Sequence, residues 1–128
     1  MKVSRPNPLA LLIGTAVLVL SLAGCGNDTR VVQARNGIVE LTLTDYRVGP
    51  QIVRVRKDSL TIRVTNTGRL PHAFRLRGEG GTRLKIPTLK PGETGARVGI
   101  RLARGKWRMF CPLANHEELG LYGTLVVR

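Results

Sequence analysis

The chain has 128 residues, which is room for one domain, and its formal net charge is +13 at pH 7. A basic domain suits nucleic acid, yet only five residues are aromatic and the arginines alternate along predicted strands, so no platform for stacking bases is evident. The composition therefore argues against nucleic-acid binding. It leaves open anionic lipid headgroups, an acidic protein partner, or a solvated basic face without a dedicated partner.

The first 24 residues have the features of an export signal. Lys2 and Arg5 form a basic start, and the apolar run from Leu9 to Gly24 is shorter than the ~20 residues of a membrane-spanning helix. The run ends in the sequence LAGC at 22–25, which resembles the bacterial lipobox. In that motif, small residues before a cysteine admit a signal peptidase, and the thiol carries a diacylglycerol. The resemblance implies a lipoprotein signal peptide over 1–24 and lipidation at Cys25.

Lipidation would hold the exported domain on the outer face of the cytoplasmic membrane, or on the periplasmic side, because each buried methylene contributes ~0.8 kcal/mol. Two other interpretations stay open: an ordinary cleaved signal with a spare cysteine, and an uncleaved anchor helix. Either of them would still export the domain. Loss of residues 1–24 removes two basic residues and no acidic one, which lowers the net charge to +11.

If Cys25 is acylated, Cys111 is the one free thiol of the sequence. A lone thiol outside the cytosol is open to oxidation, so either burial or metal ligation is expected for it. Residues 25–36 have little apolar periodicity, and we predict that they form the acylated cysteine and a tether. The folded domain is predicted over 37–128.

From residue 37 onward, apolar and polar residues alternate in short runs that end at turn residues, as is typical of half-buried strands. Pro87 is expected to stop one run, and 78–81 is expected to be a flexible link. Runs at intervals of roughly 8 to 12 residues predict an all-β domain, a Greek-key antiparallel β-sandwich of about seven or eight strands. The predicted strands cover 38–43, 46–56, 59–65, 72–77, 84–89, 94–102, 106–111 and 121–127.

Two histidines and one cysteine stand at junctions between predicted loops and strands. His72 follows the turn at 66–71, while Cys111 and His116 lie in the sequence CPLANH at 111–116. Together they offer two imidazoles and one thiolate. In a trigonal arrangement with a weak or absent axial donor, this ligand set makes a blue-copper electron-transfer site.

Each of these residues also has a plainer interpretation. His72 is then a strand histidine with satisfied hydrogen bonds, Cys111 a small buried apolar residue, and His116 a residue of a surface loop. Glu117 and Glu118, next to His116, are expected to be solvated or to orient a partner. For any single residue the plainer interpretation is favoured, whereas the combination favours metal ligation.

The predicted domain resembles the cupredoxin family over its whole length. The closing signature of that family is a cysteine, a histidine and a methionine separated by short loops, followed by a glycine and a final strand. Cys111, His116, Leu121 and the sequence GTLVV at 123–127 match it. The distant first histidine of the family, on a strand after an asparagine-containing turn, is matched by His72. The resemblance implies one type 1 copper ion held by His72, Cys111 and His116.

Two positions depart from the family pattern. Leu121 stands where the axial methionine usually is, and a leucine cannot donate to a metal. Family members with leucine there imply a three-coordinate copper and a raised reduction potential, because loss of the axial donor disfavours Cu(II) more than Cu(I). Ala73 stands where many members carry an asparagine that ties the two ligand loops together. Asn115 and Asn66 are the candidates to replace it.

The resulting hypothesis is a one-electron carrier that is not an enzyme, is monomeric and is attached to the membrane by its lipid. We expect its redox partner at an apolar patch of Leu70, Pro71, Pro112 and Leu113, and the basic surface favours an acidic partner. Two alternatives fit the same sequence: a module that stores or delivers copper, and a metal-free sandwich that acts as a surface interaction domain.

Overall fold

The structure of the chain is a computed structural model, and it describes residues 31–57 and 59–128. The predicted signal peptide, the lipidation site at Cys25 and the first part of the predicted tether lie outside these residues. No helix of the described part is long and apolar enough to cross a membrane. Strands are its regular secondary structure, in agreement with the predicted all-β class.

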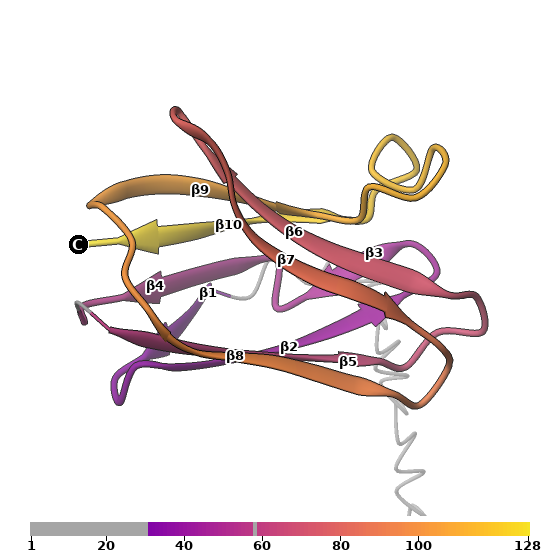
Figure 1. Cartoon of the computed structure of the whole chain (residues 1–128), viewed down its shortest axis with the longest axis horizontal. Helices are drawn as coiled ribbons and strands as arrows, with labels where there is room; N and C mark the ends of the chain where they lie inside the picture. The colour runs from indigo at the N-terminus through magenta and orange to yellow at the C-terminus, as the bar shows by residue number, and fades with distance from the viewer. Residues whose placement is uncertain (1–30, 58) are drawn as a thin grey trace, which may run out of the picture.

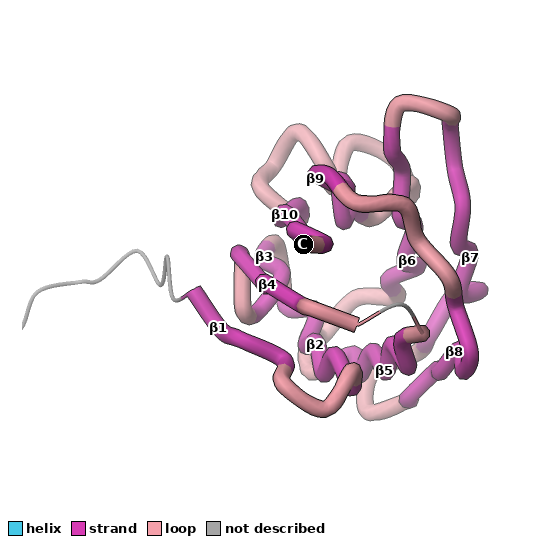
Figure 2. Tube along the Cα trace, turned by 90° about the vertical axis from the view of Figure 1, so that its left-hand side faces the viewer, coloured by secondary structure: helices cyan, strands magenta, loops and turns pink. Residues whose placement is uncertain are grey.

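Two sheets enclose a shared interior (Figure 1, Figure 2). One sheet has six strands in the order β1-β4-β10-β9-β6-β7, and the other has four in the order β3-β2-β5-β8. This arrangement confirms the predicted β-sandwich. The strands are β1 (Val31–Ala34), β2 (Ile38–Thr44), β3 (Arg47–Gly49), β4 (Ile52–Val55), β5 (Leu60–Asn66), β6 (His72–Gly78), β7 (Gly81–Leu89), β8 (Thr94–Ile100), β9 (Gly105–Phe110) and β10 (Tyr122–Val127).

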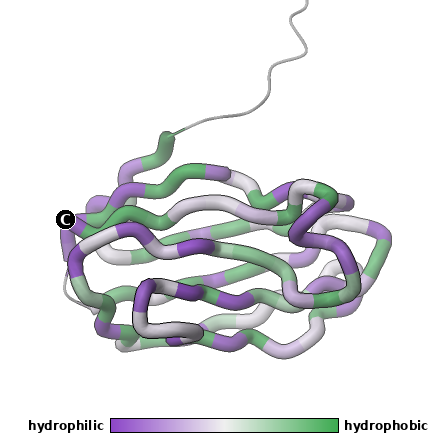
Figure 3. Tube along the Cα trace, turned by 90° about the horizontal axis from the view of Figure 1, so that it is seen from above, coloured by the Kyte–Doolittle hydropathy of each residue, from purple (hydrophilic) through white to green (hydrophobic). Residues whose placement is uncertain are grey.

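The alternation of apolar and polar residues along the strands produces the core. In β5, Leu60, Ile62 and Val64 are buried, whereas Thr61 and Arg63 point outward. Figure 3 shows the same change between hydrophobic and hydrophilic residues along the chain. Inward-facing side chains from both sheets form one continuous cluster. Removal of this apolar surface from water, at ~25 cal/mol per Å², is what holds the sheets together.

The sheets are mixed, which corrects the prediction of a purely antiparallel sandwich. β4 runs parallel to both β1 and β10, and β2 runs parallel to β5, whereas the other described pairings are antiparallel. Ten strands are present in the described residues instead of seven or eight. One reason is that the predicted run over 46–56 divides at Pro50 into β3 and β4. Periodicity within a strand carries no information about the direction of its neighbour, so the sequence pattern could not reveal the parallel pairs.

Strand β1 lies in the segment that was expected to be a tether. It pairs in register with β4, from Val31 beside Ile52 to Ala34 beside Val55. Most of its side chains are exposed, so no apolar alternation marks it in the sequence. The predicted start of the folded domain at residue 37 is therefore too late.

Strand β7 is also longer than expected. Pro87 lies inside it instead of ending it. The strand is at the edge of the six-stranded sheet, where the missing N–H of a proline is tolerated. The segment 78–81, expected to be a flexible link, is a tight connection in which Gly78 pairs with Gly81, so β6 and β7 form a hairpin.

The burial pattern predicts a contrast between two valines. Val64 is fully buried on β5, whereas Val98 on β8 is 80% exposed. Val64→Ala should lower the free energy of unfolding by roughly 2 kcal/mol, because it leaves a cavity in the core, and Val98→Ala should change it by less than ~0.5 kcal/mol. Urea denaturation measures both values. Equal losses for the two variants would contradict the described packing.

Candidate metal centre

Strand register brings the three predicted ligands to one end of the six-stranded sheet. β6 begins at His72, β9 ends at Phe110 just before Cys111, and β10 begins at Tyr122, after the loop that contains His116. β9 is antiparallel to both β6 and β10. The end of β9 therefore lies beside the starts of the other two strands, at the end of the molecule away from the chain terminus marked C in Figure 1.

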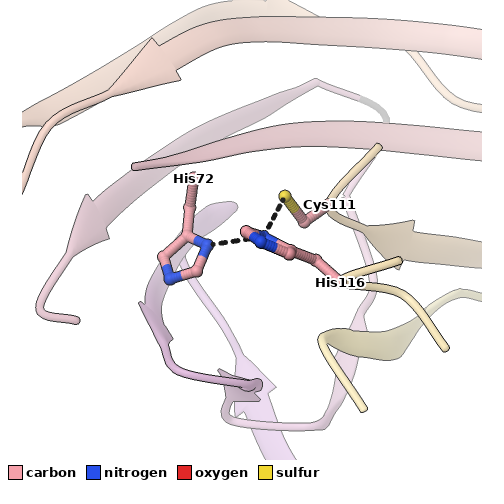
Figure 4. Close-up of side chains that lie close together, drawn as sticks. All are labelled: His72, Cys111 and His116. Atoms are coloured by element: carbon pink, nitrogen blue, oxygen red, sulfur yellow. Dashed lines mark hydrogen bonds between the residues drawn. The ribbon is translucent and has the colours of Figure 1, made fainter. Parts of the chain in front are cut away.

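The three side chains point toward one another (Figure 4). The Nδ1 atoms of His72 and His116 are 3.2 Å apart, and the Sγ atom of Cys111 lies 3.5 Å from His116 Nδ1. All three ligand atoms lie within 4.8 Å of one another. His72 and Cys111 are fully buried, and His116 is half-buried. The structure thus places together the three residues that the sequence singles out.

This donor set fits a metal ion. Electron pairs that face one another repel unless a proton or a cation lies between them, and here three donors converge. Bonds of about 2.0–2.3 Å, such as zinc forms with nitrogen and sulfur, would put neighbouring atoms of a trigonal plane about 3.5 Å apart. Two of the three separations, 3.2 and 3.5 Å, are close to that value, and the third is within 4.8 Å. Two imidazoles and one thiolate are a ligand set that copper accepts.

Asp45, which follows β2, fixes the orientation of His72. One carboxylate oxygen of Asp45 lies 2.6 Å from Nε2 of His72. An ionised carboxylate only accepts hydrogen bonds, so Nε2 is the donor. In the neutral ring, Nδ1 then carries the lone pair and faces Cys111 and His116. A carboxylate that holds the outer nitrogen of a histidine ligand is a common device for orienting that ligand and raising its basicity.

Asp45 is itself held by the loop that precedes His72. The backbone N–H groups of Arg69 and Leu70 donate to its two oxygens, at 2.7 and 3.4 Å. The hydrogen bond from Arg69 is the largest of the influences that lower the pKa of Asp45; the contacts with His72 and Leu70 act in the same direction, and burial opposes them. A Cβ atom on Gly68 would collide with the carboxylate, so only glycine leaves it room.

His116 has a different environment. Its ring meets the ring of Tyr46 edge to face, with centroids 5.0 Å apart. Burial lowers the pKa of His116, the nearby His72 lowers it further, and the charge of Asp45 partly opposes both. A lowered pKa keeps the ring neutral at neutral pH, and a neutral imidazole is the form that binds a metal.

Glu117 anchors the loop that carries His116. Its carboxylate accepts a hydrogen bond of 2.9 Å from Nε of Arg108 on β9, and Arg77 on β6 approaches it at 3.4 Å. The guanidinium groups in turn lie over aromatic rings, Arg108 over Tyr122 and Arg77 over Phe110. Glu117 is therefore ion-paired to the sheet and not simply solvated, which corrects that part of the expectation for this residue.

Comparison with known proteins gives structural matches only. No family model matches the sequence, and no curated protein matches it. Reduced auracyanin from Roseiflexus castenholzii has a TM-score of 0.66 at 15% identity, over 73% of this chain and 98% of its own. Auracyanin A, a blue copper protein from Chloroflexus aurantiacus, has a TM-score of 0.59 at 18% identity, over 72% and 100% of the two chains. A multicopper oxidase matches at 0.53 and 21% identity, over 71% of this chain and 41% of the oxidase.

Almost the whole length of both auracyanins superposes on the described strands. The chain has the cupredoxin fold. Within this cupredoxin fold, Leu121 lies between the ligand loop and β10 and is fully buried. The N–H of Cys111 donates to the carbonyl of Leu121 at 3.2 Å, and the N–H of Leu121 donates to the carbonyl of His116 at 3.0 Å. The backbone of Leu121 therefore links the backbones of Cys111 and His116.

Asn66 and Asn115 were the candidates to replace the asparagine that is absent at position 73. Neither joins the two ligand loops in the way that was expected of them. The amide of Asn66 donates to the carbonyls of Leu70 and Leu89, and its oxygen accepts from the N–H of Gly68. Asn66 thus stiffens the loop before His72. In the described residues, no hydrogen bond joins a side chain of Asn66 or Asn115 to Cys111, so neither ties the two ligand loops of this cupredoxin fold together.

Sequence reasoning missed Asp45 and Tyr46. In the structure both lie in the short turn after β2, whereas Tyr46 was expected to begin a strand, and Asp45 is 27 positions from the histidine that it contacts. A turn aspartate is common, because its side chain readily bonds nearby backbone N–H groups. The parallel pairing of β2 with β5 places this turn next to the loop before His72, and that pairing is the feature that periodicity does not reveal.

The contact with Asp45 predicts the tautomer of His72. In the metal-free protein, at a pH where the ring is neutral, the ¹⁵N chemical shifts should show a protonated Nε2 and an unprotonated Nδ1. Asp45→Ala should give a mixture of both tautomers, because the acceptor is lost. Asp45→Asn is the matched control: it keeps an oxygen acceptor and should retain the Nε2–H form. A wild-type His72 with its proton on Nδ1 would contradict the assigned hydrogen bond.

Proposed function

We propose that the domain holds one type 1 copper ion through His72, Cys111 and His116 and transfers single electrons. The observation that carries this proposal is the convergence of three ligand atoms within 4.8 Å at one end of a cupredoxin fold. A copper ion held by these residues would supply one-electron chemistry between Cu(II) and Cu(I). Thiolate sulfur suits Cu(I), and imidazole suits both oxidation states.

The chain contributes hydrogen bonds that hold the three proposed ligands in place. Asp45 holds His72, the backbone of Leu121 holds the loop between Cys111 and His116, and Glu117 holds that loop to the sheet. Electron transfer is fast when the ligands move little between the two oxidation states. The hydrogen bonds of Asp45, Leu121 and Glu117 support such a role, because they restrain the ligands and the loop that carries them.

Leu121 closes the axial side of the proposed site without acting as a ligand. Its side chain is fully buried, and its backbone is hydrogen-bonded to the backbones of Cys111 and His116, which supports this place for residue 121. An apolar axial neighbour favours Cu(I) and therefore a raised reduction potential.

The surface around His116 is suited to a protein partner. Leu70 and Leu119 are 40% and 50% exposed, and Pro71 and Pro112 are also exposed. Leu113 is half-buried against the core and contributes less than expected. An apolar patch beside the half-buried histidine is a route by which electrons reach the copper from a redox partner, and an acidic rim on that partner would complement the basic charge of this chain.

We further propose that the domain is exported, anchored to the membrane by lipid at Cys25, and monomeric. The lipobox-like sequence at 22–25 supports the anchor. One His-Cys-His cluster was found in the described part of the chain. A single proposed copper centre favours a carrier over an enzyme that needs several coppers.

The decisive experiment compares the same substitution at two cysteines. Cu(II)-loaded full-length chain should absorb intensely in the visible range through its copper–thiolate bond. Cys111→Ser should abolish this absorption, because a serine oxygen does not replace the thiolate. Cys25→Ser should leave it unchanged.

The proposal fails if the Cys111→Ser variant keeps the intense band. It also fails if the reduced wild-type protein does not bind copper in stoichiometric amount, and that result would favour a metal-free interaction domain. Copper binding without reversible one-electron reduction would favour storage or delivery.

The axial position allows a separate prediction. Leu121→Met conserves volume, so the fold should tolerate it, and it places a thioether beside the metal. If the new donor favours Cu(II) over Cu(I) by about tenfold, the reduction potential falls by about 59 mV. Leu121→Ile adds no donor and is the control for packing. Voltammetry measures the potentials, and an unchanged or raised potential in the methionine variant would refute an axial place for residue 121.

A further inference from the structure

A pocket of about 350 Å³ lies far from the metal centre and is lined mainly by arginines. β1, β4 and β10 run toward the end of the molecule that carries the C label in Figure 1, whereas the ligand loops are at the other end. We call this feature the arginine pocket. Its lining residues are Gln33, Ala34, Arg35, Arg54, Arg56 and Arg128.

The strand register explains why four arginines gather there. β4 lies between β1 and β10 and is parallel to both. Arg54 pairs with Gln33 on one side and with Val126 on the other. The last paired residues of the three adjacent strands are Ala34, Val55 and Val127. The next residue on each strand is an arginine: Arg35, Arg56 and Arg128. Neighbouring strands are about 4.8 Å apart, so side chains in this row are close to one another.

Such a row of like charges is unfavourable without a counter-charge. In residues 31–57 and 59–128, no ion pair involves any of the four guanidinium groups. The Nε atom of Arg54 is the one buried side-chain nitrogen or oxygen of this part that has no hydrogen-bond partner. A buried unsatisfied donor costs about 1–3 kcal/mol, and more when it is charged. Among the described residues, the four guanidinium groups thus have no acidic side chain as a partner, and the pocket is open to an anionic acceptor.

We propose that the arginine pocket binds a phosphate group. A guanidinium presents two parallel N–H donors, which match the oxygens of a phosphate. A phosphate has enough oxygens to bond several guanidinium groups at once, whereas a carboxylate has two. The pocket has room for such a group, since a water molecule takes about 30 Å³ in the liquid. No aromatic side chain lines it, so it offers no surface for stacking a nucleic-acid base.

The phosphate has two chemical sources, a phospholipid headgroup and free inorganic phosphate. β1 lines the pocket and begins six positions after Cys25, the predicted lipidation site. A headgroup bound there would turn the opposite end of the molecule, with the metal centre, away from the bilayer. This inference goes beyond the electron-transfer proposal and does not depend on copper.

The test uses the full-length chain in micelles of a neutral maltoside detergent at constant ionic strength. In one arm inorganic phosphate is added, and in the other phosphatidylglycerol is mixed into the micelles. The ¹⁵N resonances of the arginine Nε–H groups report the position of binding. Saturable shifts confined to Arg54 and its neighbours in the pocket support the proposal. Shifts in both arms indicate a general phosphate site, and shifts in the lipid arm alone indicate a headgroup site.

Two double variants distinguish a specific phosphate site from nonspecific attraction of phosphate by positive charge. Arg54→Lys with Arg56→Lys keeps every charge but removes the planar donor pairs, and it should weaken binding about tenfold, the loss of about one charged hydrogen bond. Arg47→Lys with Arg97→Lys makes the same change at exposed arginines outside the pocket and should leave the affinity unchanged.

Three outcomes would overturn the proposal. They are the absence of saturable shifts in both arms, shifts spread evenly over the arginines of the chain, and equal affinity in the two double variants. The first measurement is made on the wild-type chain, so the proposal remains testable even if a variant does not fold.

Discussion

The hydrogen-bonded register of β6, β9 and β10 is the constraint on which the site depends. It brings two segments more than thirty residues apart to one end of the sheet, with His72 on one side and Cys111 and His116 on the other. A shift of one residue in β6 would turn His72 to the other face. The buried side chains on the inner face prevent that shift, because it would expose Phe74 and Leu76 to water. The apolar core thus fixes the position of the polar ligands.

The sequence predicted those features that depend on residues close together in the chain. Alternation within β5 predicted which side chains are buried, and in β6 it failed only at Ala73, which is also buried; the sequence CPLANH predicted a loop shared by Cys111 and His116. The parallel partners of β4 and β2 were missed, because pairing between distant strands leaves no periodic trace in either strand. The role of Asp45 depends on one of these pairings. It was therefore out of reach of any argument from sequence spacing.

The arginines at the two ends of the molecule have different surroundings. Near the metal centre, Arg77 and Arg108 are paired with Glu117 and covered by aromatic contacts, which leaves apolar residues beside His116. At the opposite end, the arginines of the arginine pocket have no such partners among the described residues. The composition alone could not make this distinction, because it gives the net charge of +13 and not its arrangement. The two ends of the sandwich are consequently suited to different kinds of contact.

The two histidines are held unequally. His72 has no exposed surface, and its outer nitrogen is bonded to a carboxylate that is anchored by two backbone N–H groups. His116 belongs to a loop and is half-buried. An ion held by these ligands would be reached more easily on the side of His116, since rotation of His72 would break its contact with Asp45. A partner that covers His116 would therefore also cover the more exposed side of the candidate site.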